Sequence, residues 1–139
     1  MYIEDITVGM SAEIRKTVTQ GDIQAFADVS GDHNPVHLDP EFAATTPFKG
    51  VIAHGMLSAS FLSAIFGTQL PGPGTIYLGQ SLRFLAPVRP GDEVRTVATV
   101  TELMPEKRRV ICKTTCYVGE AVVIDGEATL MVPSKVAKT

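Results

Sequence analysis

Residues 30–37, Ser-Gly-Asp-His-Asn-Pro-Val-His, carry more side chains capable of chemistry than any other segment of the chain. They place the carboxylate of Asp32 a few positions before the imidazole of His37. A carboxylate and an imidazole that reach the same water molecule form an acid/base pair that works near neutral pH. Adding water to a double bond, or removing it, requires such a pair.

The same segment also fits a purely structural role, because Asp and Asn side chains often bond to nearby backbone in turns. Pro35 fixes its own φ and disfavours helical backbone at Asn34, so we expect an extended or turning loop here. In that loop Asn34 would shape the backbone rather than take part in catalysis. Asp32 and His37 are then either a catalytic pair or a capping carboxylate beside a packed ring.

Two capping patterns predict the helices that flank this segment. Thr19 followed by Asp22 resembles a capping box and predicts a helix through about Val29. The run Asp39-Pro40-Glu41 combines an N-cap with proline at the first helical position, and it predicts a short helix through about Thr45. The candidate acid/base pair would therefore lie between two helices.

Residues 54–66 are almost free of charge and predict a helix that is buried nearly all round, with Gly67 as its stop. Gly55 falls at the start of this helix, where free backbone N–H groups and the positive end of the helix dipole point outward. Such N–H groups stabilise the negative charge that develops on a carbonyl oxygen during reaction. We expect His54 only to shape the start of the helix.

The rest of the chain reads as strands rich in Val, Thr and Ile, which are separated by Pro- and Gly-containing turns. The expected strands are residues 12–18, 75–87, 92–104, 109–118 and 121–132. One long apolar helix followed by hairpin-linked strands predicts an α+β fold in which an antiparallel sheet wraps around the central helix. Such a sheet leaves open edges, which pairing with a second chain would cover.

Composition narrows the class of protein. A chain of 139 residues, 45% hydrophobic and 19% charged, suits one domain over residues 1–139. The net charge of −3 argues against a nucleic-acid partner, and we interpret the basic triplet at 107–109 as solvated charge. No stretch resembles a signal peptide or a membrane span, so we expect a cytoplasmic protein without a membrane partner.

Metal and cysteine chemistry are not predicted. His33 and His37 have the spacing of a helical metal pair, but Pro35 between them disfavours the helix that would carry both ligands. Cys112 and Cys116 lie in one expected strand, where four residues at about 3.3 Å each separate their Cα atoms by roughly 13 Å. That separation is too long for a disulfide, so we interpret both as buried thiols.

Several segments resemble the MaoC-like hydratases, and most closely the (R)-specific enoyl-CoA hydratases. The similarity lies in residues 26–43, 54–56, 77–84 and 87–94 and so extends over nearly the whole chain. The resemblance implies a hot-dog fold, a homodimer, and syn addition of water to a trans-2-enoyl-CoA to give an (R)-3-hydroxyacyl-CoA. It implies no cofactor, because coenzyme A is part of the substrate.

The resemblance also assigns roles to individual residues. Asp32 and His37 match the family's catalytic pair, which holds the attacking water between them. The backbone N–H of Gly55 matches the donor that polarises the thioester carbonyl, and Ser63 matches a serine that supports the catalytic site. His33 stands where relatives often carry an aromatic residue, so we interpret it as variable.

Phe66 and Leu130 match family positions that line the far end of the acyl pocket. Since Phe66 is bulky, we expect short acyl chains of around four to six carbons.

Three alternatives remain open at this point: a dehydratase acting on acyl carrier protein, a hot-dog acyl-CoA thioesterase, and a non-catalytic acyl-CoA-binding protein. The pathway, whether fatty-acid oxidation or supply of polyhydroxyalkanoate precursors, is also open.

Overall fold

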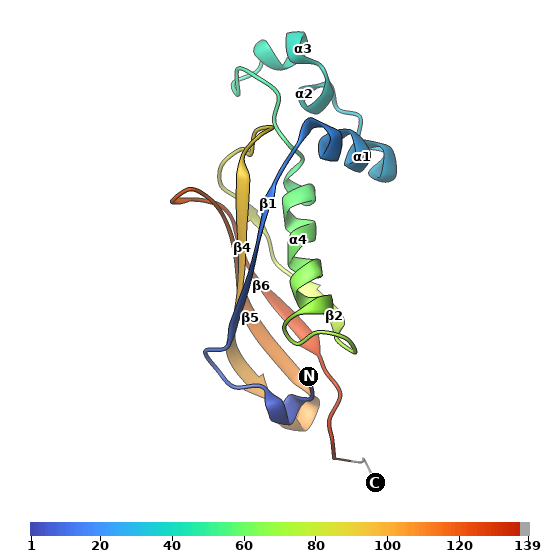
Figure 1. Ribbon diagram of the computed structural model, residues 1–139, viewed down its shortest axis with the longest axis vertical. Helices are drawn as coiled ribbons and strands as arrows, with labels where there is room; N and C mark the ends of the chain where they lie inside the picture. The colour runs from blue at the N-terminus through green and yellow to red at the C-terminus, as the bar shows by residue number, and fades with distance from the viewer. Residues whose placement is uncertain (137–139) are drawn as a thin grey trace.

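The computed structural model describes residues 1–136 and shows one antiparallel sheet with a long helix, α4, packed along one of its faces (Figure 1). The strand order is β1-β4-β5-β6-β2, and the short β3 pairs with β6. The strands are β1 (Ser11–Thr17), β2 (Ile76–Gln80), β3 (Arg83–Phe84), β4 (Glu93–Met104), β5 (Arg109–Val118) and β6 (Ala121–Met131). The α+β fold predicted from the sequence is confirmed.

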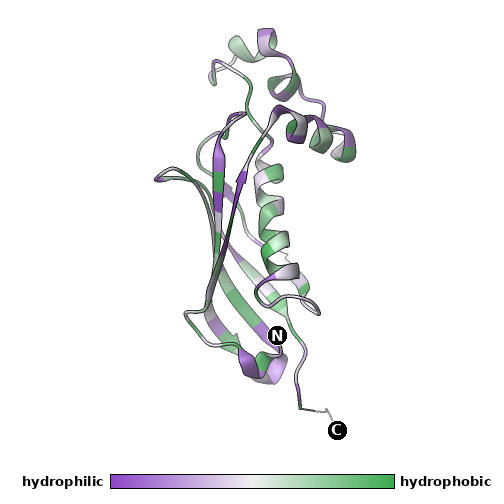
Figure 2. Cartoon of the chain, viewed as in Figure 1, coloured by the Kyte–Doolittle hydropathy of each residue, from purple (hydrophilic) through white to green (hydrophobic). Residues whose placement is uncertain are grey.

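Helix α4 (Gly55–Thr68) presents its large apolar side chains to the sheet. Leu62, Ile65 and Phe66 are almost completely buried and pack with strand residues such as Val100 and Leu130. In Figure 2 the helix is mostly coloured as hydrophobic, whereas hydrophobic and hydrophilic positions alternate along strands such as β4. Burial of this apolar area supplies most of the favourable free energy that holds the layers together.

Two expectations about α4 are wrong. The helix is not buried all round, because Met56, Ser60, Ser63 and Ala64 lie on a face that is exposed in the single chain. Gly67 does not end the helix either; it is the last residue but one. Glycine without a positive φ is compatible with a helical turn, and the helix ends only where the backbone leaves helical geometry after Thr68.

Three shorter helices lie together beyond one end of the sheet (Figure 1): α1 (Gln20–Ser30), α2 (Pro35–Leu38) and α3 (Pro40–Ala44). The predicted capping box is present, since Thr19 Oγ1 accepts from the Asp22 N–H and the Asp22 carboxylate accepts from the Thr19 N–H. Asp39 caps α3 as predicted, by accepting from Glu41 N–H.

The expectation of a loop through residues 30–37 is wrong in its second half, because Pro35 begins the one-turn helix α2. Proline is well suited to the first helical position, where the N–H that it lacks would have no partner in the helix. Asn34 is outside helical backbone, at φ −54° and ψ 125°, as expected for a residue before proline.

The expected strand at 75–87 is broken into β2 and β3. At the break, the carbonyl oxygen of Ser81 approaches Gly126 of β6 so closely that a Cβ on Gly126 would lie 1.9 Å from it. The side chain of Gln80 crosses the same point and donates to Thr114 Oγ1 at 2.8 Å. This crossing interrupts the ladder, whereas the strands at 92–104, 109–118 and 121–132 form within a residue of their predicted bounds.

Both cysteines are free, buried thiols, as predicted. Burial raises the pKa of Cys112 to about 11 and also raises the pKa of Cys116, so neither thiol is activated as a nucleophile. Within residues 1–136, no helix combines the length and the apolar character that crossing a membrane would need.

Candidate active site

Asp32 lies in the turn between α1 and α2, directly after Gly31, whose φ of 84° ends α1 in left-handed backbone. The Asp32 N–H donates to Ser30 Oγ at 3.1 Å, and Asp32 Oδ1 accepts from the Asn34 N–H at 3.2 Å. Its second carboxylate oxygen has no hydrogen-bond partner within residues 1–136. Asp32 therefore helps to shape the turn and still presents a free oxygen.

Asn34 has the loop-shaping position that we expected. Its Oδ1 accepts from the Val36 N–H at 3.1 Å and so caps the start of α2. This cap fixes the geometry of the short helix that carries His37.

His37 is buried, with 8% of its surface exposed, and its Nδ1 lies 2.7 Å from the carbonyl oxygen of Ile52. A carbonyl oxygen only accepts, so Nδ1 carries the hydrogen in this contact. In the neutral ring, Nε2 is then left with a lone pair that can accept a hydrogen bond. The backbone around Ile52 thus fixes both the orientation and the tautomer of His37.

His54 is the site residue that the sequence analysis treated only as helix-shaping. It is 3% exposed, its Nε2 donates to the carbonyl oxygen of Asp32 at 2.9 Å, and its ring centroid lies 3.8 Å from that of His37. Since 22 positions separate His54 from Asp32, no local spacing pattern indicates this contact. Only the fold brings the two residues together.

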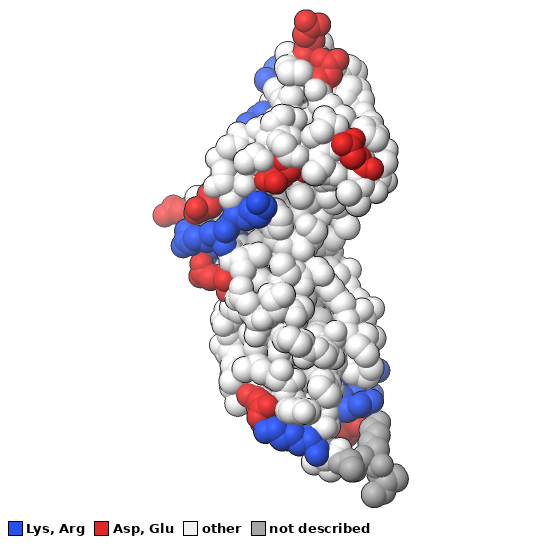
Figure 3. Space-filling model, turned by 45° about the vertical axis from the view of Figure 1, so that its right-hand side comes forward, with Lys and Arg blue, Asp and Glu red and all other residues white. Residues whose placement is uncertain are grey.

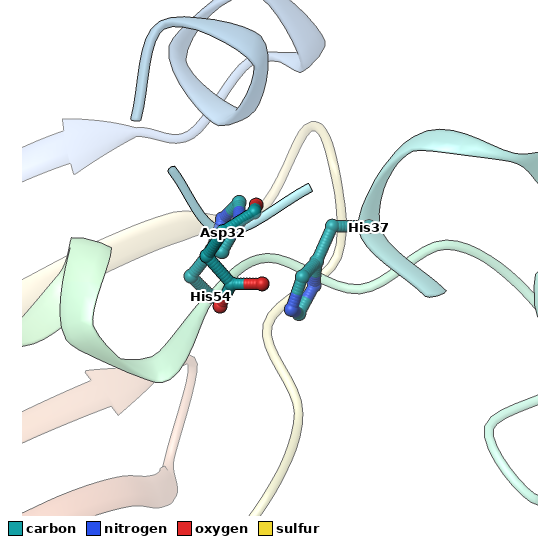
Figure 4. Close-up of side chains that lie close together, drawn as sticks. All are labelled: Asp32, His37 and His54. Carbon is teal, nitrogen blue, oxygen red and sulfur yellow. The ribbon is translucent and has the colours of Figure 1, made fainter. Parts of the chain in front are cut away.

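Asp32, His37 and His54 form a cluster in which one ligand atom from each residue lies within 4.8 Å of the others (Figure 4). A water molecule placed between Asp32 and His37 could bond to both, because two hydrogen bonds of about 2.8 Å span that separation. Two imidazoles and a carboxylate at such distances could also hold a divalent transition metal. His33, which we had considered as a ligand with His37, is exposed and lies outside this cluster.

Gly55 is the first residue of α4, and its N–H has no hydrogen-bond partner within residues 1–136. The ring of Phe84 covers its Cα, since a Cβ at Gly55 would lie 2.5 Å from that ring. The close ring leaves no room for a side chain at Gly55. Its N–H lies at the positive end of a helix of 14 residues, where a backbone donor can bind an oxygen of a ligand.

Three hollows meet around the start of α4. The catalytic pocket, of about 380 Å³, is lined by Phe26, Ser30, Asp32, His37, His54, Gly55 and Met56. The strand groove, of about 360 Å³, runs between α4 and β2 and is lined by Met56, Ala59, Ser60, Tyr77, Leu78, Gly79, Gln80 and Leu82. A loop pocket of about 370 Å³ shares His54, Gly55 and Met56 with the catalytic pocket and is otherwise mostly apolar.

The remaining predicted site residues lie away from this cluster in the single chain. Ser63 is two turns further along α4, exposed, and lines none of the three hollows. Phe66 and Leu130 are buried in the core between α4 and the sheet. Phe66 does contact the strand groove indirectly, because its ring packs edge-on against Tyr77 at a centroid distance of 5.1 Å.

Together, the fold and the site define a hot-dog protein with an acid/base centre at the start of its central helix. Residues 5–123 match the family model described as "MaoC like domain". The chain belongs to this MaoC-like family.

Individual relatives agree with this assignment. The chain is 57% identical to an (R)-specific enoyl-CoA hydratase of Rhodospirillum rubrum, over 96% of this chain and 93% of that protein. It is 49% identical to a 3-hydroxybutyryl-CoA dehydratase of Methylorubrum extorquens, over 97% and 86%. A solved structure of an (R)-hydratase from A. caviae, described as involved in PHA biosynthesis, superimposes with a TM-score of 0.91 at 46% identity, covering 94% and 99% of the two chains.

Proposed function

We propose that this protein is an (R)-specific enoyl-CoA hydratase that adds water reversibly to a trans-2-enoyl-CoA to give an (R)-3-hydroxyacyl-CoA. The observation that carries the proposal is the carboxylate of Asp32 and the imidazole of His37 within 4.8 Å, beside the free N–H of Gly55. Relatives with the names (R)-specific enoyl-CoA hydratase and 3-hydroxybutyryl-CoA dehydratase support the same reaction in its two directions.

The two side chains orient the attacking water. An ionised Asp32 and a neutral His37 with its hydrogen on Nδ1 are both acceptors, so the water donates one hydrogen to each. Its oxygen lone pair is then directed away from them, toward the β-carbon of the substrate. As the C–O bond forms, one member of the pair takes the proton from water.

Gly55 acts on the thioester carbonyl of the substrate. Its N–H donates to the thioester oxygen, which becomes negatively charged as the enolate develops. The acid/base pair then returns a proton to the α-carbon. Because the pair holds the water and delivers the proton from one side of the substrate, hydroxyl and hydrogen add to the same face.

The strand groove is the proposed acyl site, since it meets the catalytic pocket at Met56 and has mostly apolar walls. The ring of Phe66 packs edge-on against Tyr77, which lines the groove, and we propose that this contact closes the far end of the groove. This arrangement supports the short-chain preference.

Replacing Phe66 with Leu should let Tyr77 move inward and raise kcat/KM for eight-carbon relative to four-carbon enoyl-CoA. An unchanged ratio would contradict the assignment of the groove.

A homodimer is part of the proposal. Strand β2 is an edge strand with β6 on one side only, and its Ile76, Tyr77 and Leu78 are exposed large hydrophobic residues. The side of the molecule that carries α4 and β2 shows no charged residues across its middle (Figure 3). A second copy placed against β2 and the exposed face of α4 would cover this surface and bring its own residues to Ser63.

We further propose that the reaction needs no resident cofactor and takes place in the cytoplasm. The acid/base pair and the Gly55 N–H supply proton transfer and charge stabilisation from the chain itself.

The test follows the ultraviolet absorbance of the conjugated enoyl thioester of crotonyl-CoA, with free thiol measured in the same sample. Hydration removes the absorbance without releasing thiol, whereas a thioesterase releases thiol. Asp32→Asn and His37→Gln should each lower kcat by about 10³-fold with the fold intact. His33→Gln, an exposed imidazole in the same turn, is the control and should retain activity. Full activity in Asp32→Asn would refute the assigned mechanism.

A further inference from the structure

We infer that His54 is a positioning residue for the acid/base pair: it joins the turn that carries Asp32 to the start of α4 and supports the ring of His37. The inference rests on the proposed function, because it concerns how that pair is held. It adds a third side chain, which neither takes nor gives the proton in the reaction.

The first observation is the hydrogen bond from His54 Nε2 to the carbonyl oxygen of Asp32, at 2.9 Å. Asp32 itself is exposed, and its other bonds are to residues of its own turn, Ser30 and Asn34. The bond from His54 therefore links the Asp32 backbone to the central helix. Without it, the turn would keep its local shape but lose this fixed distance from Gly55.

The second observation is the contact between rings. The imidazole of His54 lies 3.8 Å from that of His37, with an angle of 32° between the planes, and 4.8 Å from the ring of Phe26. His37 is held at one edge by Ile52 and along its face by His54. Rotation of His37 about its side-chain bonds would require His54 to move as well.

The third observation concerns which nitrogen carries the hydrogen. Since Nε2 donates to a carbonyl oxygen, the neutral ring of His54 has its lone pair on Nδ1. Nδ1 is buried and has no hydrogen-bond partner within residues 1–136. The only hydrogen that neutral His54 carries on nitrogen is committed to Asp32, which is why we assign it positioning rather than proton transfer.

Two substitutions separate the bond from the ring contact. His54→Gln keeps an N–H donor at a similar distance from the backbone and removes the ring, whereas His54→Phe keeps a ring and removes the donor. We expect His54→Phe to lower kcat by about 30- to 100-fold with KM within about threefold, because small displacements of a catalytic group have effects of this size. His54→Gln should recover at least several-fold of that loss.

A matched control is Val100→Ala, which removes packing from the core far along the sheet and lowers stability without touching the pocket. It should retain kcat at temperatures below its own unfolding. Equal kcat values for His54→Gln and His54→Phe, or a loss of kcat in Val100→Ala comparable with theirs at equal stability, would overturn the inference. Such results would leave His54 as an ordinary packing residue.

A second readout does not depend on activity. Hydrogen–deuterium exchange of peptides covering residues 30–37 should accelerate about tenfold in His54→Phe and less in His54→Gln, with the strands unchanged. Unchanged exchange in both variants would refute the link between His54 and the Asp32 turn. If the wild-type protein does not hydrate crotonyl-CoA but the exchange result holds, the proposed function fails and the structural link stands.

Discussion

The cluster of Asp32, His37 and His54 has side chains suited both to acid/base catalysis and to binding a transition metal. Each imidazole gives one N–H to a backbone carbonyl, which is also how metal-binding histidines are commonly held. The acid/base mechanism needs two of these ligand groups, the Asp32 carboxylate and the His37 imidazole, to bind water. A transition metal and the catalytic water would therefore compete for one place.

This competition gives a prediction. Dialysis against EDTA should leave hydratase activity unchanged, because the proposed reaction uses the acid/base pair alone. Added Zn²⁺ should inhibit, and Asp32→Asn should bind the ion more weakly in a calorimetric titration. Loss of activity after dialysis with recovery on adding Zn²⁺ would show instead that the protein is a metal-dependent hydratase.

At the same scale, the sequence predicted roles for Asp32, His37 and Gly55 from short motifs, and the structure places all three around one pocket. The motifs indicated only a structural role for His54, because the contact with Asp32 depends on how α4 meets the turn after α1. Phe66 was assigned to the acyl pocket by resemblance; in the structure it lies in the core, and its ring contacts Tyr77 of the strand groove. Candidate residues in short motifs could thus be predicted from the sequence, whereas contacts between segments far apart in the sequence could not.

Among the elements, the ion pair between His33 and Asp28 connects the C-terminal turn of α1 to the turn that carries Asp32. His33 Nε2 lies 3.0 Å from Asp28 Oδ1, and Nδ1 lies 3.3 Å from the carbonyl oxygen of Gly31. The bond to Asp28 raises the pKa of His33 above its ordinary 6.5, and the bond to His33 lowers the pKa of Asp28 below its ordinary 3.8.

The sign of the pH effect follows from these directions. A raised pKa of His33 stabilises the fold fully below pH 6.5, and this contribution is lost as pH rises through the folded-state pKa. A lowered pKa of Asp28 stabilises the fold above pH 3.8, and this contribution is lost as pH falls through its folded-state pKa. The pair is therefore fully effective between these two values.

We expect His33→Gln to lower the melting temperature slightly at pH 5.5 and to have almost no effect at pH 9, because the pair is exposed and screened by solvent. Differential scanning calorimetry at both pH values measures the difference. Asp28→Asn is the reciprocal control and should show the same loss at pH 5.5. An equal effect of His33→Gln at both pH values would mean that its charge is not involved.

The break between β2 and β3 supports a second prediction for an element. Gly126→Ala should destabilise the protein by about 1–3 kcal/mol, since the new Cβ would overlap the Ser81 carbonyl and force β6 and the β2–β3 link apart. Gly21→Ala in α1, where the nearest atom would be 3.6 Å away, should be neutral or stabilising. Urea unfolding compares the two, and equal stabilities would show that the link yields at no cost.

The elements also show what sequence patterns could predict. The hairpin strands β4, β5 and β6 and the capped helices α1 and α3 follow from local alternation and capping residues, so their bounds were nearly correct. The break at Ser81 was missed because its cause, Gly126, is on another strand. The end of α4 was placed too early because glycine alone does not stop a helix that tertiary packing supports.

For the whole molecule, the surface formed by β2 and the exposed face of α4 predicts the oligomeric state. Leu78→Lys places a charge on this surface and should convert the proposed dimer to a monomer in light scattering after size exclusion. Activity should fall with it, because the strand groove runs along the same surface. Val8→Lys, an equally polar change at an exposed residue elsewhere, should remain dimeric. A dimeric Leu78→Lys with full activity would exclude this surface as the interface.

The position of the three short helices beyond the end of the sheet affects how the protein loses activity on heating. The acid/base pair is carried by α1, α2 and the turn between them, and none of these segments belongs to the sheet (Figure 1). We expect local opening of that region to require less free energy than unfolding of the sheet. On heating, activity should therefore be lost at a temperature at which the circular dichroism signal of the strands is unchanged. On cooling, activity should return without any refolding of the sheet.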